Sequence, residues 1–206
     1  TIERGEAFGY GGEEELSYCT EFCTFLNNGE ARGIADVVNS GTNAVFVALR
    51  SLELEPFGEI IVPPITDAGG VMPVALAGFI PIPADTAKNS YNVGPEQVEE
   101  RLSPHTRAIL VAHIAGIPVD MDPILEIAKQ RNIPVIEDCA QAHGTVYKGK
   151  KAGTLGDIAA FSTMFGKHHA TGGQGGIVYS RHAELEDRIR QHADRGKPFG
   201  LPPGSG

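Results

Sequence analysis

Short apolar runs alternate with amphipathic stretches from about residue 40 onward. Runs of this kind that end at polar residues or prolines are typical of buried strands. The pattern predicts strands at residues 58–62, 79–82, 107–113, 133–138, 158–162 and 176–180. Ile124, Ile127 and Ala128 recur at helical spacing and predict a helix over 123–131, with Pro123 in its first turn. A hairpin-like tract at 147–153 follows the fourth strand. Such alternation favours an α/β fold, a mainly parallel sheet sandwiched by helices.

The organisation of the chain changes near residue 36. Residues 1–35 are first Gly-rich and then acidic, and Phe22, Phe25 and Leu26 follow at helical spacing, which predicts an N-terminal arm or helix. Residues 36–196 are expected to form one large domain. The tail at 197–206 is typical of a loop, because Gly and Pro dominate it. Since no Met precedes Thr1, we expect a fragment of a longer protein.

Composition narrows the function classes. The chain has 206 residues, with 17 Lys and Arg against 26 Asp and Glu, a net charge of −9. That balance disfavours a nucleic-acid surface, which needs clustered positive charge. No apolar run is long enough to span a bilayer, and no charged-then-apolar leader precedes Thr1. Three cysteines form no disulfide framework. We therefore expect a cytoplasmic protein that binds neither membrane nor nucleic acid.

The stretch Ser40–Ala44 precedes an apolar, helix-forming run at residues 45–52. A Ser at the cap, with Gly41 beside it, leaves unpaired backbone N–H groups that point outward. Those groups and the helix dipole together suit a phosphate dianion. An ordinary helix cap has the same pattern, so the stretch alone leaves both interpretations open.

Two acids, Glu137 and Asp138, close the strand at 133–138. Sheets of this class place their ligands at the carboxyl ends of strands, where a carboxylate can pair with a protonated ring nitrogen or a metal. Gln141 and His143 follow within a few residues and suggest a polar cluster. The alternative is a solvated acid or a helix cap. His113, at the end of the previous strand, either lines the same site or is a core histidine.

Lys167 lies in the most informative tract, between the strand at 158–162 and a glycine-rich turn at 172–176. A lysine that is desolvated or near other cations is available as a neutral amine for Schiff-base chemistry. Glycines let the backbone pass close to a planar ligand. A flexible surface turn with an exposed lysine is the alternative. His168 and His169 also suggest a metal site, but adjacent side chains seldom converge on one ion.

These tracts, in this order, resemble the DegT/DnrJ/EryC1/StrS family of sugar aminotransferases. The motifs that carry the likeness are Ser40–Ala44, Ile136–Gly144, Phe161–Ser162 with Lys167, and Gly172–Gly176. The likeness covers about residues 36–196. It implies the aspartate aminotransferase-like fold of type I pyridoxal phosphate enzymes and a homodimer. It also implies a smaller C-terminal domain that is missing from this chain.

The resemblance also implies roles for single residues. Lys167 would bind the aldehyde of pyridoxal 5′-phosphate and later carry a proton between the substrate carbon and the cofactor carbon. Asp138 would pair with the pyridinium nitrogen, which keeps it protonated so that the ring accepts carbanion electrons. Gln141 would lie near the phenolic oxygen. These roles agree with an amine at a crowded turn and a carboxylate at a strand end.

The phosphate and the face of the ring complete the implied site. Backbone groups of Thr42 and Asn43, with the hydroxyl of Ser162, would hold the phosphate. Family members commonly place a ring-stacking aromatic residue after the position of Thr66. Asp67 stands there in this chain. We therefore expect Asp67 either to bind the cofactor, with the stacking partner elsewhere or absent, or to contact substrate instead.

The implied function is transamination in sugar, polysaccharide or antibiotic biosynthesis. Glutamate or glutamine would donate the amino group, and a nucleotide-linked keto-sugar or a keto-cyclitol would accept it. A dehydratase of the same fold, in which His replaces the lysine, is a second interpretation, raised by His168 and His169. A third is a non-catalytic homologue that binds a ligand or regulates a partner. Only the absence of the stacking aromatic favours that one.

Overall fold

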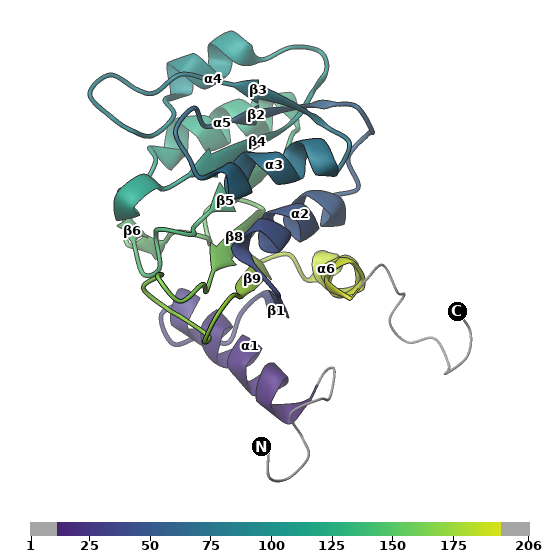
Figure 1. Ribbon diagram of the computed structural model, residues 1–206. Helices are drawn as coiled ribbons and strands as arrows, with labels where there is room; N and C mark the ends of the chain where they lie inside the picture. The colour runs from purple at the N-terminus through teal and green to yellow at the C-terminus, as the bar shows by residue number, and fades with distance from the viewer. Residues whose placement is uncertain (1–11, 195–206) are drawn as a thin grey trace.

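The computed structural model describes residues 12–194, so the predicted tail at 197–206 lies outside the described residues. A seven-stranded sheet in the order β1-β9-β8-β5-β4-β2-β3 forms its centre (Figure 1). The strands are β1 (Ile34–Val38), β2 (Glu59–Val62), β3 (Ile80–Pro83), β4 (Thr106–Ala112), β5 (Val135–Asp138), β8 (Ile158–Ser162) and β9 (Gly176–Ser180). Strands β3, β2, β4, β5 and β8 pair in parallel, and β9 pairs antiparallel with β8 and β1. The prediction of a mainly parallel sheet is confirmed.

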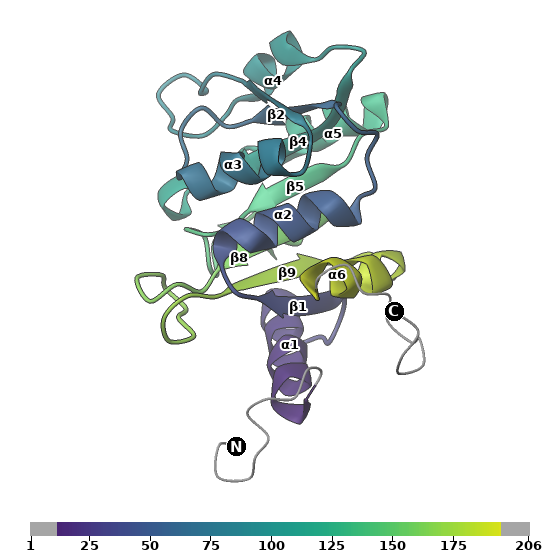
Figure 2. The ribbon, with the colours of Figure 1, turned by 45° about the vertical axis from the view of Figure 1, so that its right-hand side comes forward.

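Helices cover both faces of this sheet (Figure 2). On one face lie α2 (Gly41–Ser51), α3 (Ala68–Leu76) and α6 (Glu186–Ala193), which share a core with alternate strand residues such as Leu110 and Ile136. On the other face lie α1 (Glu13–Leu26), α4 (Pro95–Arg101) and α5 (Met121–Arg131). None of the helices in residues 12–194 is long and apolar enough to cross a membrane. The sandwich expected from the sequence is therefore present.

Most of the predicted elements are found where the apolar pattern placed them. The strands at 158–162 and 176–180 have the predicted bounds, and the helix expected at 123–131 begins two residues earlier, at Met121. The predicted hairpin is formed by β6 (Val146–Tyr147) and β7 (Lys150–Lys151), which pair antiparallel. Lys148 and Gly149 connect the two strands and have φ angles of 48° and 83°, as a tight two-residue turn requires.

Two elements that position the site have no counterpart among the predicted ones. Strand β1 crosses the expected boundary at residue 36 and pairs along its whole length with β9. Helix α3 contains Gly69, Gly70 and Pro73, which oppose a helix by propensity. It forms because Asp67 caps it and because Val74 is buried against α2 and the sheet.

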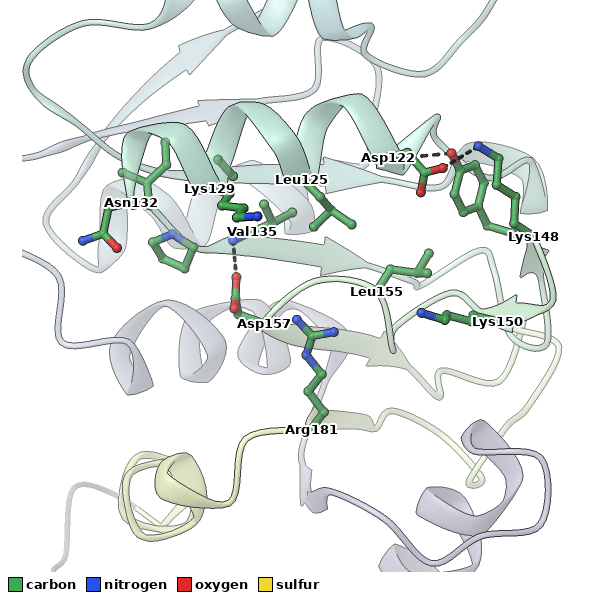
Figure 3. Close-up of a pocket in the computed structure, with 14 residues that line it drawn as sticks. Asp122, Leu125, Lys129, Asn132, Val135, Lys148, Lys150, Leu155, Asp157 and Arg181 are labelled. Atoms are coloured by element: carbon green, nitrogen blue, oxygen red, sulfur yellow. Dashed lines mark hydrogen bonds and ion pairs between the residues drawn. The ribbon is translucent and has the colours of Figure 1, made fainter.

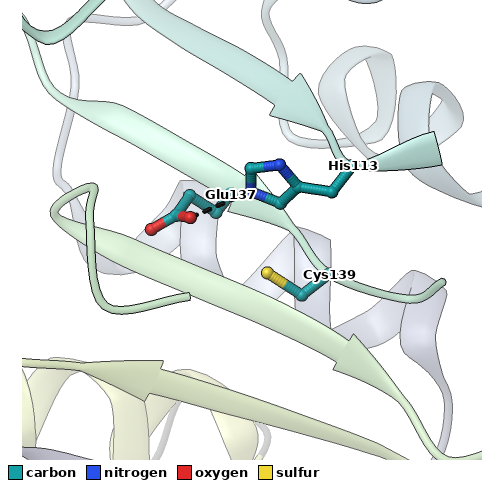
Figure 4. Close-up of side chains that lie close together, drawn as sticks. All are labelled: His113, Glu137 and Cys139. Carbon is teal, nitrogen blue, oxygen red and sulfur yellow. Dashed lines mark hydrogen bonds and ion pairs between the residues drawn. The ribbon is translucent and has the colours of Figure 1, made fainter. Parts of the chain in front are cut away.

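A single buried carboxylate ties β5 to the segment that leads into β8. Glu137 is fully buried, and its Oε1 accepts hydrogen bonds from the N–H groups of Leu155 (2.8 Å) and Gly156 (2.6 Å). Its Oε2 accepts from the N–H of Gly153 (2.8 Å) and from Nε2 of His113 (2.9 Å) (Figure 4). Four donors thus satisfy one carboxylate, as a buried charge requires.

His113, Glu137 and Cys139 lie close enough together to suggest a metal site. Nδ1 of His113, however, accepts a hydrogen bond from the N–H of Val119 (3.0 Å), so the ring proton is on Nε2 and is donated to Glu137. The imidazole therefore has no free lone pair for an ion. Burial and the neighbouring carboxylates raise the pKa of Cys139 well above its usual value, which keeps the thiol neutral. His113 is a core histidine.

The same hydrogen bonds set the ionisation of Glu137. Burial alone would raise its pKa, but the bonds from His113, Gly153 and Gly156 outweigh burial and lower it. A carboxyl whose folded pKa is depressed stabilises the fold above its unfolded pKa. That contribution is lost as the pH falls through the folded value.

Replacing Glu137 with Gln tests this anchor. We expect the free energy of unfolding at pH 7 to fall by about 3 kcal/mol, because the charge is lost and amide hydrogens face backbone donors. The difference from wild type should shrink as the pH falls through the lowered folded pKa of Glu137, because the native carboxyl also becomes neutral there. Urea unfolding over a pH series measures both effects. Glu100→Gln, on an exposed residue of α4, is the control. Equal stability of the two variants would contradict the proposed anchor.

Candidate active site

A cavity of about 190 Å³ lies where β5 and β8 end, beside the first turns of α2 and α3. It is lined by Ser40, Gly41, Thr42, Val45, Asp67, Gly69, Gly70, Asp138, Ala140, Ser162, Met164, Lys167 and Gln174. The fold thus brings together Thr42, Asp67, Asp138, Ser162 and Lys167, which are far apart in the sequence. Ligands of parallel α/β sheets bind at this edge.

Asp138 faces the cavity because side chains alternate along a strand. Its neighbour Glu137 points to the opposite face, so the two consecutive acids have separate environments. Oδ1 of Asp138 accepts a hydrogen bond from the N–H of Ala140 (3.0 Å). Burial raises the pKa of Asp138; that hydrogen bond and the charge of Lys167 oppose the rise, and Asp67 adds to it. A cationic partner in the cavity would therefore favour the ionised form.

The first turn of α2 is prepared for an anion. Ser40 caps the helix, and its Oγ accepts a hydrogen bond from the N–H of Asn43 (3.1 Å). The N–H groups of Gly41 and Thr42 precede the first intrahelical bond. A Cβ at residue 41 would lie 2.6 Å from Cβ of Ser162, so glycine is needed for this turn to lie against the end of β8. Backbone N–H groups and a hydroxyl therefore meet at one point.

The first turn of α3 forms the neighbouring wall. Oδ1 of Asp67 caps this helix by accepting the N–H of Gly69 (3.0 Å). A Cβ at Gly69 would lie 2.5 Å from Oγ1 of Thr42, and one at Gly70 would lie 2.8 Å from Oδ2 of Asp138. The two glycines thus let α3 approach both residues. Because α3 already carries a negative cap and α2 has a neutral one, an anion is favoured at α2.

Lys167 lines the cavity from a loop that is held in place by its own backbone. The N–H of Lys167 donates to the carbonyl of Met164 (2.9 Å), and the N–H of Phe165 donates to the carbonyl of Gly173 (2.9 Å). The N–H of Thr171 donates to Thr163 (3.0 Å). Backbone hydrogen bonds thus join the two arms of this loop as in a hairpin. The loop brings the half-buried Lys167 to the cavity that Asp138 lines.

The two histidines after Lys167 lie elsewhere. His168 and His169 line a separate hollow with His143 and Tyr18, where Nε2 of His169 and the hydroxyl of Tyr18 are 2.7 Å apart. The ring nitrogens of His143 have no hydrogen-bond partner among the described residues. Neither His168 nor His169 replaces Lys167 in the cavity.

Two residues singled out in the sequence do not line the cavity. The N–H of Asn43 is already bonded to Ser40, and Oε1 of Gln141 accepts the N–H of Ala115 (2.7 Å). Gln174, within the glycine-rich turn, does line it. So do Gly69 and Gly70, and a glycine pair two residues after Asp67 was the signal that could have identified them.

Comparison with known proteins agrees with this geometry. Residues 1–199 match the DegT/DnrJ/EryC1/StrS aminotransferase family. Over 162 residues the chain is 39% identical to GDP-perosamine synthase of Escherichia coli O157:H7, which covers 79% of this chain and 44% of that protein.

Solved structures show the same relationship. The fold matches the aminotransferase from Psychrobacter cryohalolentis with a TM-score of 0.91 and 33% identity, over 98% of this chain and 52% of that one. NtdA from Bacillus subtilis, solved with bound cofactor PMP, matches with a TM-score of 0.83 and 27% identity, over 93% of this chain and 42% of that one. The chain thus spans about half the length of these relatives. The resemblance seen in the sequence is confirmed, and the chain belongs to the DegT/DnrJ/EryC1/StrS aminotransferase family.

Proposed function

We propose that the whole protein is a pyridoxal phosphate-dependent aminotransferase that moves an amino group from glutamate or glutamine to a nucleotide-linked keto-sugar. The observation that carries this proposal is that Lys167, Asp138 and the N-terminus of α2, which has a neutral cap, line one cavity. An amine, a buried carboxylate and an anion site are the three features that this cofactor needs. Relatives named as sugar aminotransferases support the substrate class.

The residues present fit the cofactor. The N–H groups of Gly41 and Thr42, with the hydroxyl of Ser162, would hold the phosphate, and Gln174 would lie beside it. Glycine at 69 and 70 lets α3 lie directly against Thr42 and Asp138, because a Cβ at either residue would collide with one of them. A planar ring would lie in the cavity that these glycines, Asp138 and Lys167 line.

When bound, the cofactor supplies an aldehyde that takes up amino groups and a ring that accepts carbanion electrons. Nζ of Lys167 would bind that aldehyde. Once an incoming amine has freed it, the same nitrogen would carry a proton between the substrate carbon and the cofactor carbon. Asp138 would hold a proton on the ring nitrogen, and the cation so formed would offset the cost of burying this carboxylate.

Asp67 would contact the substrate. One of its oxygens caps α3, and its side chain lines the cavity at the position where family members commonly place a ring-stacking aromatic residue. The second oxygen is then available to a hydroxyl or ammonium group of the substrate. Substrates with such a group on that side would be preferred.

From the family resemblance we also propose a homodimer, a cofactor-binding domain at 36–196 and a smaller C-terminal domain beyond residue 206. From the sequence pattern we propose a cytoplasmic location and an N-terminal arm at 1–35. The dehydratase alternative is disfavoured, because Lys167 lines the cavity while His168 and His169 lie in another hollow.

The role of Lys167 is tested with the whole protein and pyridoxal phosphate. Wild type should show the visible absorption band of a lysine-bound cofactor, and Lys167→Ala should abolish it. Lys88→Ala, on an exposed residue, is the control and should keep the band. Glutamate should bleach the band of an aminotransferase and leave that of a non-catalytic binder unchanged. Persistence of the band in Lys167→Ala would rule out the assignment.

Asp138→Asn should separate stability from function. The folded pKa of Asp138 is raised, so its ionised form destabilises the cofactor-free protein as the pH rises through that value. At pH 8 the cofactor-free variant should therefore melt at a higher temperature than wild type, while amination with bound cofactor falls at least about 100-fold. Calorimetry without cofactor and single-turnover kinetics with it measure the two effects. A variant that melts lower and keeps full activity would contradict both.

Asp67→Asn keeps a side chain that caps helices well but removes the charge. We expect normal cofactor absorbance. The KM for the keto-sugar should rise about tenfold, because one charge-assisted hydrogen bond to the substrate is lost. The rate of the glutamate half-reaction should change less. Steady-state kinetics with each substrate varied separately makes the comparison. An unchanged KM for the sugar would show that Asp67 serves only as the cap of α3.

A further inference from the structure

A second hollow, of about 750 Å³, lies on the opposite side of the domain, where the parallel strands β5 and β8 begin (Figure 3). It is bounded by α5, the β6–β7 hairpin, the segment before β8 and the residue after β9. Val135, which lines it, begins the strand that Asp138 ends, and Asp157 precedes the strand that Ser162 ends. A strand of four or five residues spans about 13–17 Å, so this hollow is separate from the candidate active site.

The lining of this hollow is basic although the chain is acidic. Its cations are Lys129, Lys148, Lys150 and Arg181, and its acids are Asp122 and Asp157. The chain as a whole carries a net charge of −9. Positive charge is therefore gathered at one place, which calls for a physical reason.

The two acids are already engaged. Asp122 pairs with Nζ of Lys148 at 2.5 Å. Oδ2 of Asp157 accepts the N–H of Val135 (2.8 Å), and its Oδ1 lies 3.3 Å from Nε2 of His182. Four cations therefore line the hollow against two acids, which leaves an excess of positive charge.

Three of the four cations form no ion pair within the part of the chain that the structure describes. Within residues 12–194, no acceptor contacts the ammonium groups of Lys129 and Lys150, and the guanidinium of Arg181 bonds only through Nε to His182 (3.2 Å). Figure 3 shows these side chains extending from three different elements toward the same space. Like charges that converge repel one another, and a bound anion would reverse that cost.

The floor of the hollow is apolar. Val135 and Leu155 are buried there, and Leu125 and Ile133 add further carbon surface. The volume falls within the range of small-molecule sites. An apolar floor under a basic rim suits a ligand with a planar or apolar body and an anionic end.

We propose that this hollow binds a phosphorylated small molecule of the nucleoside diphosphate class. The diphosphate would lie among Lys129, Lys150 and Arg181, since a guanidinium fork and two ammonium groups match phosphate oxygens. The base would lie on Leu125 and Leu155. This site is separate from Lys167 and does not rest on the proposed aminotransferase activity.

The test uses the whole, cofactor-loaded protein and a fluorescent probe, N-methylanthraniloyl-ADP. Wild type should bind the probe saturably, and binding should weaken as salt is raised. The double variant Lys150→Glu/Arg181→Glu should bind at least about tenfold more weakly, because two attractive charges become repulsive. Lys88→Glu, far from the hollow, is the matched control and should bind as wild type does.

Competitors identify the part of the probe that is recognised. Inorganic pyrophosphate and ADP should both displace it, and adenosine should displace it only weakly. Lys129→Gln/Lys150→Gln, which removes charge from two exposed side chains without reversing it, should weaken binding less than the double reversal and keep the wild-type melting temperature. Equal affinity of the double reversal variant and wild type, or displacement by adenosine alone, would overturn the proposal.

Discussion

The arrangement of this domain depends on the burial of one carboxylate. Glu137 accepts four hydrogen bonds from three neighbouring N–H groups at 153–156 and from His113. Losing any of them would leave a buried charge less well compensated. The segment that enters β8 is thereby fixed against β5, and the end of β4 is fixed through the histidine. A polar contact, rather than apolar packing alone, sets how these three strands align.

That constraint also determines the proposed cofactor site. Because Glu137 is held on one face of the sheet, Asp138 must point to the other, toward α2 and α3. The register of β5 against β8 pairs Asp138 with Ala160, so Ser162 lies two residues further along the same face. Lys167 then returns to this place on a loop bonded to Met164. Glu137, whose role is structural, thus orients Asp138, for which we propose a role in holding the cofactor.

The sequence was sufficient where the signal is local. Apolar strands such as 158–162, the Ser40 cap and the lysine in its glycine-rich tract are each visible within a few residues. The separate roles of Glu137 and Asp138 were not visible, because they depend on partners at 153–156 that only the fold brings near. The same holds for Gln141, whose amide oxygen is used by Ala115. Helix α3 was missed because its cap and its packing outweigh two glycines and a proline.

The two edges of the parallel sheet carry different chemistry for one topological reason. Strands β4, β5 and β8 run the same way, so residues that follow them gather at one edge and residues that precede them gather at the other. Lys167 and Asp138 belong to the first edge, while Lys129 and Asp157 belong to the second. An anion at the first edge is drawn to the backbone N–H groups and dipole of α2, whose cap is neutral, whereas at the second edge the side-chain cations that line the hollow would draw one. A phosphate site on this second edge must therefore depend on charge and salt far more than the first.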